Sequence, residues 1–143
     1  MNRRELMKGG AALAGMALAA AAVAAEHRHD HAGMQHDHLF AALGDCIQLG
    51  QACLSHCHDL LGEGEKSMAG CAKSVSEMLA LCGALQQLAN QRSRHTGRLA
   101  TLAMEACRQC EDECSKHAEK HEICKACGES CATCARACEK IAA

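Results

Sequence analysis

The chain has 143 residues, a formal net charge of −2 at pH 7, and no proline, tryptophan or tyrosine. This length suits a single domain, and the absence of a basic stripe interleaved with aromatic residues argues against a nucleic-acid partner. Thirteen cysteines, ten histidines and seven methionines accompany a single phenylalanine, Phe40. Abundant Ala, Leu, Glu, Lys and Gln predict an all-α protein whose core is built from leucine and cysteine.

Residues 1–25 have the pattern of a twin-arginine signal peptide. Arg3 and Arg4 open a basic segment, an Ala- and Gly-rich apolar run follows, and Ala22-Val23-Ala24 offers a cleavage site. The apolar run is marginal in length and hydrophobicity for a membrane anchor. The sequence therefore predicts export by the twin-arginine route, to the periplasm or beyond, with no membrane contact after cleavage of the signal.

Residues 26–36 form a short polar tail that contains His27, His29, His31 and His36. Such a biased segment has too little apolar surface to pack, so we expect it to be flexible. Two roles remain open from its composition, namely weak capture of metal ions and a solubilising N-terminus.

The domain from 37 to 143 contains four helical segments, predicted at about 37–61, 65–91, 97–117 and 122–141. Gly62 and Gly64 end the first segment, and Thr96 is a candidate N-cap for the third. Helices joined by short connections favour an antiparallel four-helix bundle with up-down-up-down topology.

The cysteines recur at alternating steps of three and four residues, which is the spacing of one face of an α-helix. The sequence therefore predicts a cysteine-lined core. The residues expected to face inward are Leu39, Leu43, Cys46, Gly50, Cys53, Cys57 and Leu60 in the first helix; Met68, Cys71, Val75, Met78, Cys82, Leu85 and Ala89 in the second; Ala100, Ala103, Cys107, Cys110 and Cys114 in the third; and Cys124, Cys127, Cys131, Cys134 and Cys138 in the fourth.

Antiparallel packing sorts these residues into two ends. One end, which we call the plug, is apolar and gathers Leu39, Leu43, Leu85, Ala89, Ala100 and Ile141. The other end, which we call the mouth, gathers Cys57, Met68, Cys71, Cys114 and Cys124, together with His56, His58, His117 and His121. The bundle is thus expected to be closed by leucine at one end and edged with sulfur and imidazole at the other.

Several kinds of chemistry could use thiols in a core. Structural disulfides suit an exported protein, but thirteen is an odd number, and cysteines three or four apart in one helix would close very small loops. A structural zinc ion takes four ligands and leaves nine thiols unexplained, and the spacing matches neither the bacterial iron–sulfur run nor a haem attachment motif. A thiol oxidoreductase would place its C-x-x-C pair in βαβ surroundings rather than within a helix.

Binding of many Cu(I) ions is the interpretation that uses all thirteen cysteines. Soft thiolate and thioether ligands select Cu(I), and two sulfurs on adjacent turns of one helix already suffice for an ion. Each bound cation also offsets the cost of a buried negative charge. Without metal, a neutral cysteine behaves as a small hydrophobe, so the empty bundle can remain folded.

These residues resemble the exported copper storage proteins, which are cysteine-lined four-helix bundles that hold many Cu(I) ions. The resemblance covers the chain from about His36 to Ala143. Its most specific segments are Cys53-Leu-Ser-His56-Cys57, Ser67-Met68-Ala-Gly-Cys71, Leu81-Cys82-Gly83-Ala84-Leu85 and Cys124-Lys-Ala-Cys127-Gly-Glu-Ser-Cys131. The resemblance implies that His56 and Met68 pass copper through the mouth, and that the bundles assemble as homo-tetramers.

The sequence therefore predicts a store or buffer of multiple Cu(I) ions without a catalytic step. The predicted ligands are Cys46, Cys53, His56, Cys57, Met68, Cys71, Cys82, Cys107, Cys110, Cys114, Cys124, Cys127, Cys131, Cys134 and Cys138. Met78 and Met104 are expected to be plain core residues. Two alternatives remain: a chaperone that hands copper to an exported cuproenzyme, and a disulfide-stapled structural protein.

Overall fold

The computed structural model describes the backbone of residues 11–143 and the side chains from residue 33 onwards. This part of the chain forms α1 (Ala11–Gly62), a 3-10 turn η1 (Lys66–Met68), α2 (Ala69–Asn90), α3 (Thr96–Ser115) and α4 (Glu122–Glu139), with no β-strand among the described residues. The predicted all-α class is confirmed. Arg3 and Arg4, on which the export prediction rests, lie outside the described residues.

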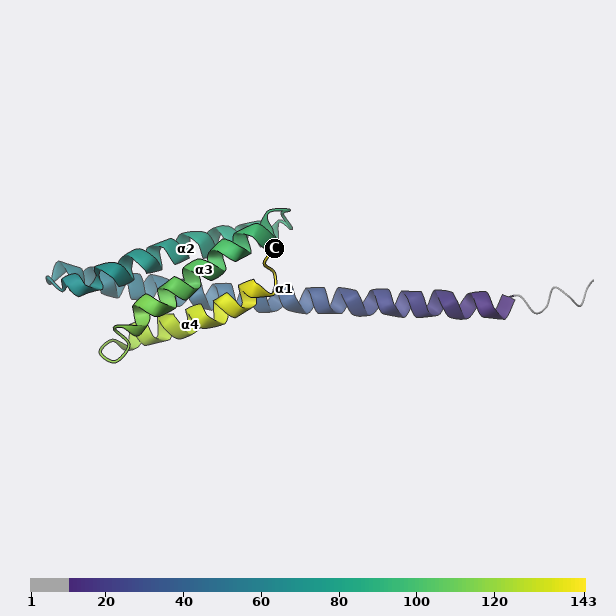
Figure 1. Cartoon of the computed structure of the whole chain (residues 1–143), viewed down its shortest axis with the longest axis horizontal. Helices are drawn as coiled ribbons and strands as arrows, with labels where there is room; N and C mark the ends of the chain where they lie inside the picture. Colours follow the sequence, from purple (N-terminus) through teal and green to yellow (C-terminus); the bar gives the residue numbers. More distant parts are fainter. Residues whose placement is uncertain (1–10) are drawn as a thin grey trace, which may run out of the picture. The chain divides into compact units, whose positions relative to one another are not determined.

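The compact unit from Gln35 to Ala143 is the predicted antiparallel four-helix bundle. The helices alternate in direction, so that the α1–α2 and α3–α4 connections meet at one end and the α2–α3 connection and the C-terminus at the other (Figure 1). At this second end the backbone N–H of Ala143 donates to the carbonyl oxygen of Gly97 over 3.3 Å. The short connections leave each helix no alternative to packing back against its predecessor.

Helix α1 begins at Ala11, so the predicted start near residue 37 is wrong. The helix continues through residues 26–36, which the sequence analysis assigned to a flexible tail. Alanine has the highest helix propensity, and propagation adds a hydrogen bond per residue once a helix has started. No proline interrupts this stretch, and Gly33 alone does not end the helix.

The other helix ends lie close to their predicted positions. Helix α1 ends at Gly62, and Gly64 has a φ of 97°, a left-handed conformation that glycine adopts without strain. Thr96, the candidate N-cap, is instead the first residue of α3, and His95 occupies the cap position without a side-chain hydrogen bond. The Thr96 hydroxyl donates to the carbonyl oxygen of Ser93 over 2.8 Å, so it stabilises the preceding turn rather than the helix N-terminus.

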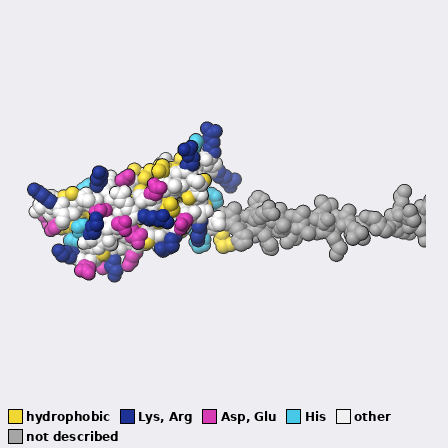
Figure 2. Space-filling view, in the orientation of Figure 1, with side chains coloured by type: hydrophobic (Ala, Val, Ile, Leu, Met, Phe, Trp, Pro, Cys, Tyr) yellow, Lys and Arg dark blue, Asp and Glu magenta, His cyan; other side chains and the backbone are white. Residues whose placement is uncertain are grey.

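Sulfur fills most of the bundle interior. All thirteen cysteines are fully buried, as are Met68 and Met78, while Leu39, Leu43 and Leu85 form the plug. Ile141 packs only partly against this core. Figure 2 shows charged side chains of both signs scattered over the visible face of the bundle, as expected for the solvated sides of amphipathic helices.

One described segment, Lys66–Asn90, is long and apolar enough to cross a membrane by length and composition alone. No membrane contact was predicted after cleavage of the signal. The finding is weak, because the core helix of a bundle passes the same test and this helix turns Cys71, Val75, Met78 and Cys82 into the interior. Its apolar composition is therefore explained by burial within the bundle.

Candidate metal centre

The thirteen cysteines reach the interior because each helix repeats them at steps that return to the same face. All thirteen are free thiols in this structure. The two sulfurs of Cys82 and Cys107 lie 3.5 Å apart, well beyond the about 2.05 Å of a disulfide bond. The core is therefore a set of reduced thiols, available as ligands.

The thiols gather in four groups, in each of which all Sγ atoms lie within 4.8 Å of one another. Two groups have four members and two have three. They are Cys53, Cys57, Cys71 and Cys124, which we call the mouth group; Cys46, Cys82, Cys107 and Cys134, the inner group; and two middle groups, Cys53, Cys114 and Cys127, and Cys110, Cys127 and Cys131. Every core cysteine except Cys138 belongs to at least one group.

Contacts between helices connect these groups. Cys53 belongs to the mouth group and to one middle group, and Cys127 belongs to both middle groups. Cys46 of the inner group lies 3.7 Å, sulfur to sulfur, from Cys131. At about 2.3 Å per metal–sulfur bond, two sulfurs up to about 4.6 Å apart can share one ion. The groups thus form a continuous series of sites along the bundle.

The ionisation of the thiols depends on their surroundings. Burial raises the pKa of Cys57 and of Cys124, because a thiolate loses its hydration there, and the negative charge of Cys53 adds to the effect. Hydrogen bonds lower the pKa of Cys46; the bond from Cys107 has the largest effect and the bond from Cys131 the next largest. Ionising all of these thiols in the empty core would bury many uncompensated negative charges, so a bound cation is needed before all of them can ionise.

The mouth brings together three of the four predicted histidines. Nε2 of His56 lies 3.0 Å from Nδ1 of His121, within hydrogen-bond distance. The rings of His117 and His121 are 6.5 Å apart between centroids. His58, by contrast, is exposed on the outer side of α1. The turn η1 buries Met68 completely at the same end, so this end carries imidazole and thioether above the mouth group.

Met78 lies in the interior as predicted, but its sulfur makes a contact that was not foreseen. Met78, expected to be plain core, is fully buried, and its Sδ accepts a hydrogen bond from the Cys46 thiol over 3.4 Å. Its inward position in α2 between Cys71 and Cys82 was predicted from periodicity, whereas its contact with Cys46 of α1 depends on how the two helices pack. His121 was placed at the mouth but was not among the predicted ligands.

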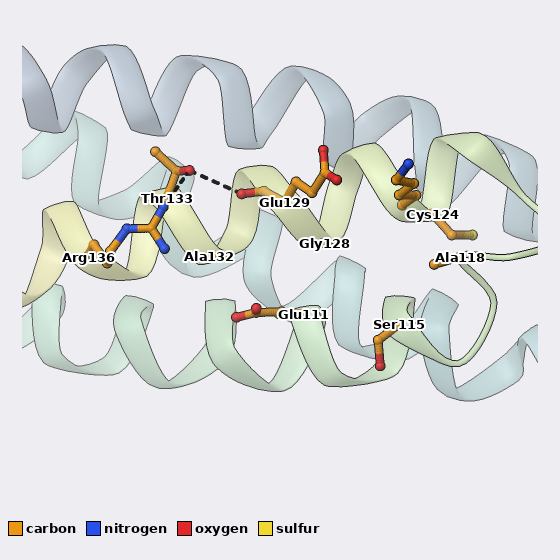
Figure 3. A pocket seen from close by; sticks show the side chains of 10 residues that line it. Glu111, Ser115, Ala118, Cys124, Gly128, Glu129, Ala132, Thr133 and Arg136 are labelled. Atoms are coloured by element: carbon orange, nitrogen blue, oxygen red, sulfur yellow. Dashed lines mark hydrogen bonds between the residues drawn. The ribbon is translucent and has the colours of Figure 1, made fainter.

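The outer surface carries a groove of about 390 Å³ between α3 and α4 (Figure 3). Glu129, Thr133 and Arg136 form a hydrogen-bonded series along its α4 side. Cys124 is the single thiol among the lining residues, and its side chain lies at the end of the groove near Ala118. Because Cu(I) takes at least two sulfurs in such a protein, the groove is not a second copper site.

Residues 33–143 match the family model described as copper storage protein. The chain belongs to the copper storage protein family. This assignment agrees with the thiol-lined bundle, and members of this family are storage proteins rather than enzymes. The chain stores copper by binding multiple Cu(I) ions through its core cysteines.

Solved structures of copper storage proteins have the same fold. The apo form of copper storage protein 3 from Bacillus subtilis is 27% identical, with a TM-score of 0.66 over 75% of this chain and 98% of that one. The Cu(I)-bound copper storage protein BsCsp3 is also 27% identical, with a TM-score of 0.69 over 76% and 99%. A comparison with curated protein sequences gave no significant match.

A further neighbour corrects the predicted location. A cytosolic copper storage protein from Streptomyces lividans is 23% identical, with a TM-score of 0.65 over 76% of this chain and 95% of that one. Its description contradicts the predicted export to the periplasm by the twin-arginine route, and that prediction is wrong on this comparison. An Ala-rich run after two arginines is a weak signal, because the same composition also favours an ordinary helix, and α1 is helical from Ala11.

Proposed function

We propose that the thirteen core cysteines of this copper storage protein hold Cu(I) as one connected store, loaded through the mouth. The observation that carries the proposal is the connection of the four thiol groups: Cys53 and Cys127 each belong to two of them, and Cys46 of the inner group lies 3.7 Å from Cys131 of a middle group. Shared ligands let an ion move from one group to the next without leaving the sulfur lining. Cys138, which lies outside the groups, would take the last position toward the plug.

Loading exchanges thiol protons for copper. An ion bound by two thiolates replaces two protons with one positive charge, so part of the buried negative charge remains with each site. When one thiolate binds two copper ions, its negative charge is shared between the two cations, and the excess negative charge at each site falls. The many closely spaced thiols thus favour filling of several sites together over filling of one isolated site.

His56 and Met68 are proposed as the entry ligands, with His121 as a third. Imidazole in its neutral form and thioether both bind a soft cation without first losing a proton. Copper can therefore be held at the mouth before any buried thiol ionises. From there it passes to Cys57 and Cys71 of the mouth group, while the leucines of the plug close the opposite end.

The proposed role has no catalytic step, and its partners are copper ions and the protein that supplies or receives them. A cuproenzyme or a copper chaperone fits this role. By resemblance to the family, four bundles assemble as a tetramer. The alternative within the same chemistry is a chaperone that carries one or two ions at a time.

Anaerobic titration of the reduced protein with Cu(I), in competition with a chromophoric chelator, tests the store. For a store we expect uptake approaching one ion per cysteine. Uptake of only one or two ions per chain would indicate a chaperone, and no uptake would overturn both the store and the chaperone. A count of free sulfhydryls in freshly purified protein tests the disulfide-stapled alternative, which requires few.

Two single variants provide a matched comparison for the titration. Cys127→Ser removes a thiol that belongs to two groups, and Cys138→Ser removes the thiol that belongs to none. A connected store predicts the larger loss of capacity for Cys127→Ser. Equal losses would mean that the thiols bind independently and that the overlap of the groups has no role.

A further inference from the structure

The sulfur lining has a gap in its cysteines halfway along the bundle. Between Cys46 and Cys53, α1 turns Gly50 inward, and between Cys71 and Cys82, α2 turns Val75 and Met78 inward. At this level only α3 and α4 supply thiols, as the middle group of Cys110, Cys127 and Cys131. Copper that moves from this group to the inner group must cross toward the side of the bundle formed by α1 and α2.

Met78 lies at this crossing. Its Sδ is 3.4 Å from Sγ of Cys46, which belongs to the inner group, and Sγ of Cys46 is in turn 3.7 Å from Sγ of Cys131 in the middle group. The sulfurs of Cys46 (α1), Met78 (α2) and Cys131 (α4) are thus connected in series. Both contacts are shorter than the about 4.6 Å that can separate two sulfurs bound to one ion.

The neighbouring helix accommodates this placement. A Cβ atom built on Gly50 would lie 2.7 Å from the terminal methyl carbon of Met78, so with any larger residue at position 50 this methyl group would have to move. The position of the Met78 thioether therefore depends on the absence of a side chain at Gly50. This arrangement holds the Met78 sulfur against thiols rather than against hydrocarbon alone.

We propose that Met78 is a Cu(I) ligand that completes the sulfur lining between the middle group and the inner group. This inference rests on the proposed function. The step is a ligand exchange without electron transfer: copper on Cys131 gains bonds to Cys46 and Met78 and loses its bond to Cys131, while the thiol proton of Cys46 passes to the Cys131 sulfur 3.7 Å away. A thioether suits this junction because it binds Cu(I) beside Cys46 while remaining uncharged.

Packing alone is the competing explanation, since methionine also fills irregular gaps in cores. Met78→Leu separates the two, because leucine keeps the volume and the apolar character but has no sulfur. Met104→Leu is the matched control: Met104 is half-buried on α3, packs against the same core, and makes no sulfur contact with a described cysteine.

The first measurement is anaerobic Cu(I) uptake followed by the ultraviolet absorbance of the copper–thiolate bond. In Met78→Leu the initial part of uptake should match the wild type, and the final part, which fills the inner group, should slow about tenfold, the scale on which a lost supporting group weakens metal binding. Met104→Leu should follow the wild type throughout. Thermal unfolding of the apo proteins establishes that both variants fold.

The second measurement observes the thioether directly. In full-length protein labelled with ¹³C at the methionine methyl groups, the signals of Met78 and Met104 are assigned by their loss in the two variants. Stepwise Cu(I) addition should shift the Met78 signal and leave the Met104 signal in place. A Met78 signal that does not move, or unchanged uptake by Met78→Leu, would overturn the inference. In either case, Cu(I) uptake by the wild type would still support the proposed copper store. No Cu(I) uptake by the wild type would overturn both the store and the role of Met78.

Discussion

His56 and His121 meet across the mouth of the bundle, with Nε2 of one ring 3.0 Å from Nδ1 of the other. The contact connects the end of α1 to the residue that precedes α4, and the two rings are 4.8 Å apart between centroids in an edge-on arrangement. Two half-buried imidazoles thus lie together at the end where the mouth group of cysteines begins. The two rings are hydrogen-bond partners of each other, and on the proposed entry path they would separate or rotate when copper binds.

Replacement of His56 by alanine together with Met68 by leucine should slow copper loading and leave the capacity nearly intact. Both residues lie at the entrance, whereas the thiols that hold the copper remain. The uptake rate should fall by about tenfold or more, and the final number of ions by one at most. The exposed His58, changed to alanine, is the matched control. Unchanged rates in the double variant would remove His56 and Met68 from the path of entry.

Gly50→Ala should destabilise the apo protein by about 1–3 kcal/mol, because the new methyl group would overlap Met78 and Leu79 within a filled core. Gly44→Ala in the same helix meets nothing within 4 Å, so it should stabilise the protein by about 0.5–1 kcal/mol through helix propensity alone. Chemical denaturation under reducing conditions measures both. A stabilised Gly50→Ala would show that the core around Met78 is loose.

The stability of the apo protein should fall as the pH rises above about 9. Burial raises the pKa of Cys57 and Cys124 above the ordinary thiol value of 9.0. In the unfolded chain these thiols ionise near pH 9, whereas in the folded protein they stay protonated. The stability that they contribute is therefore fully present below about pH 9, and it is lost as the pH rises further. Denaturation at about pH 7 and about pH 10 checks this. The copper-loaded protein should lack this dependence, because its thiols have already lost their protons.

Ser74→Ala should raise the stability of the apo protein by about 1 kcal/mol. The hydroxyl of Ser74 is buried and makes no hydrogen bond of good geometry within the described part of the chain; its interaction with the Cys110 thiol, whose pKa it helps to lower, replaces its lost hydration only in part. Ser76→Ala on the exposed side of the same helix is the control, since it reports the change in helix propensity alone. Equal effects of the two substitutions would mean that the Ser74 hydroxyl finds a partner in solution.

The sequence by itself determined the helices and the side of each that carries sulfur. The steps of three and four between cysteines are a local property, since a residue's direction from a helix depends only on its position along that helix. The bundle, the plug of Leu39, Leu43 and Leu85, and the burial of all thirteen cysteines could therefore be predicted. The start of α1 could not, because its capping signals are absent and an Ala-rich run simply continues the helix.

Only the tertiary structure decided which sulfurs share a site. The rotation and the relative shift of two packed helices depend on how their side chains interlock, and periodicity within one helix carries no information about either. The overlap at Cys53 and Cys127, the contact of His56 with His121, and the position of Met78 against Cys46 all arise between helices. The chain thus encodes a sulfur-lined face on every helix, and packing turns those faces into a connected series of copper sites.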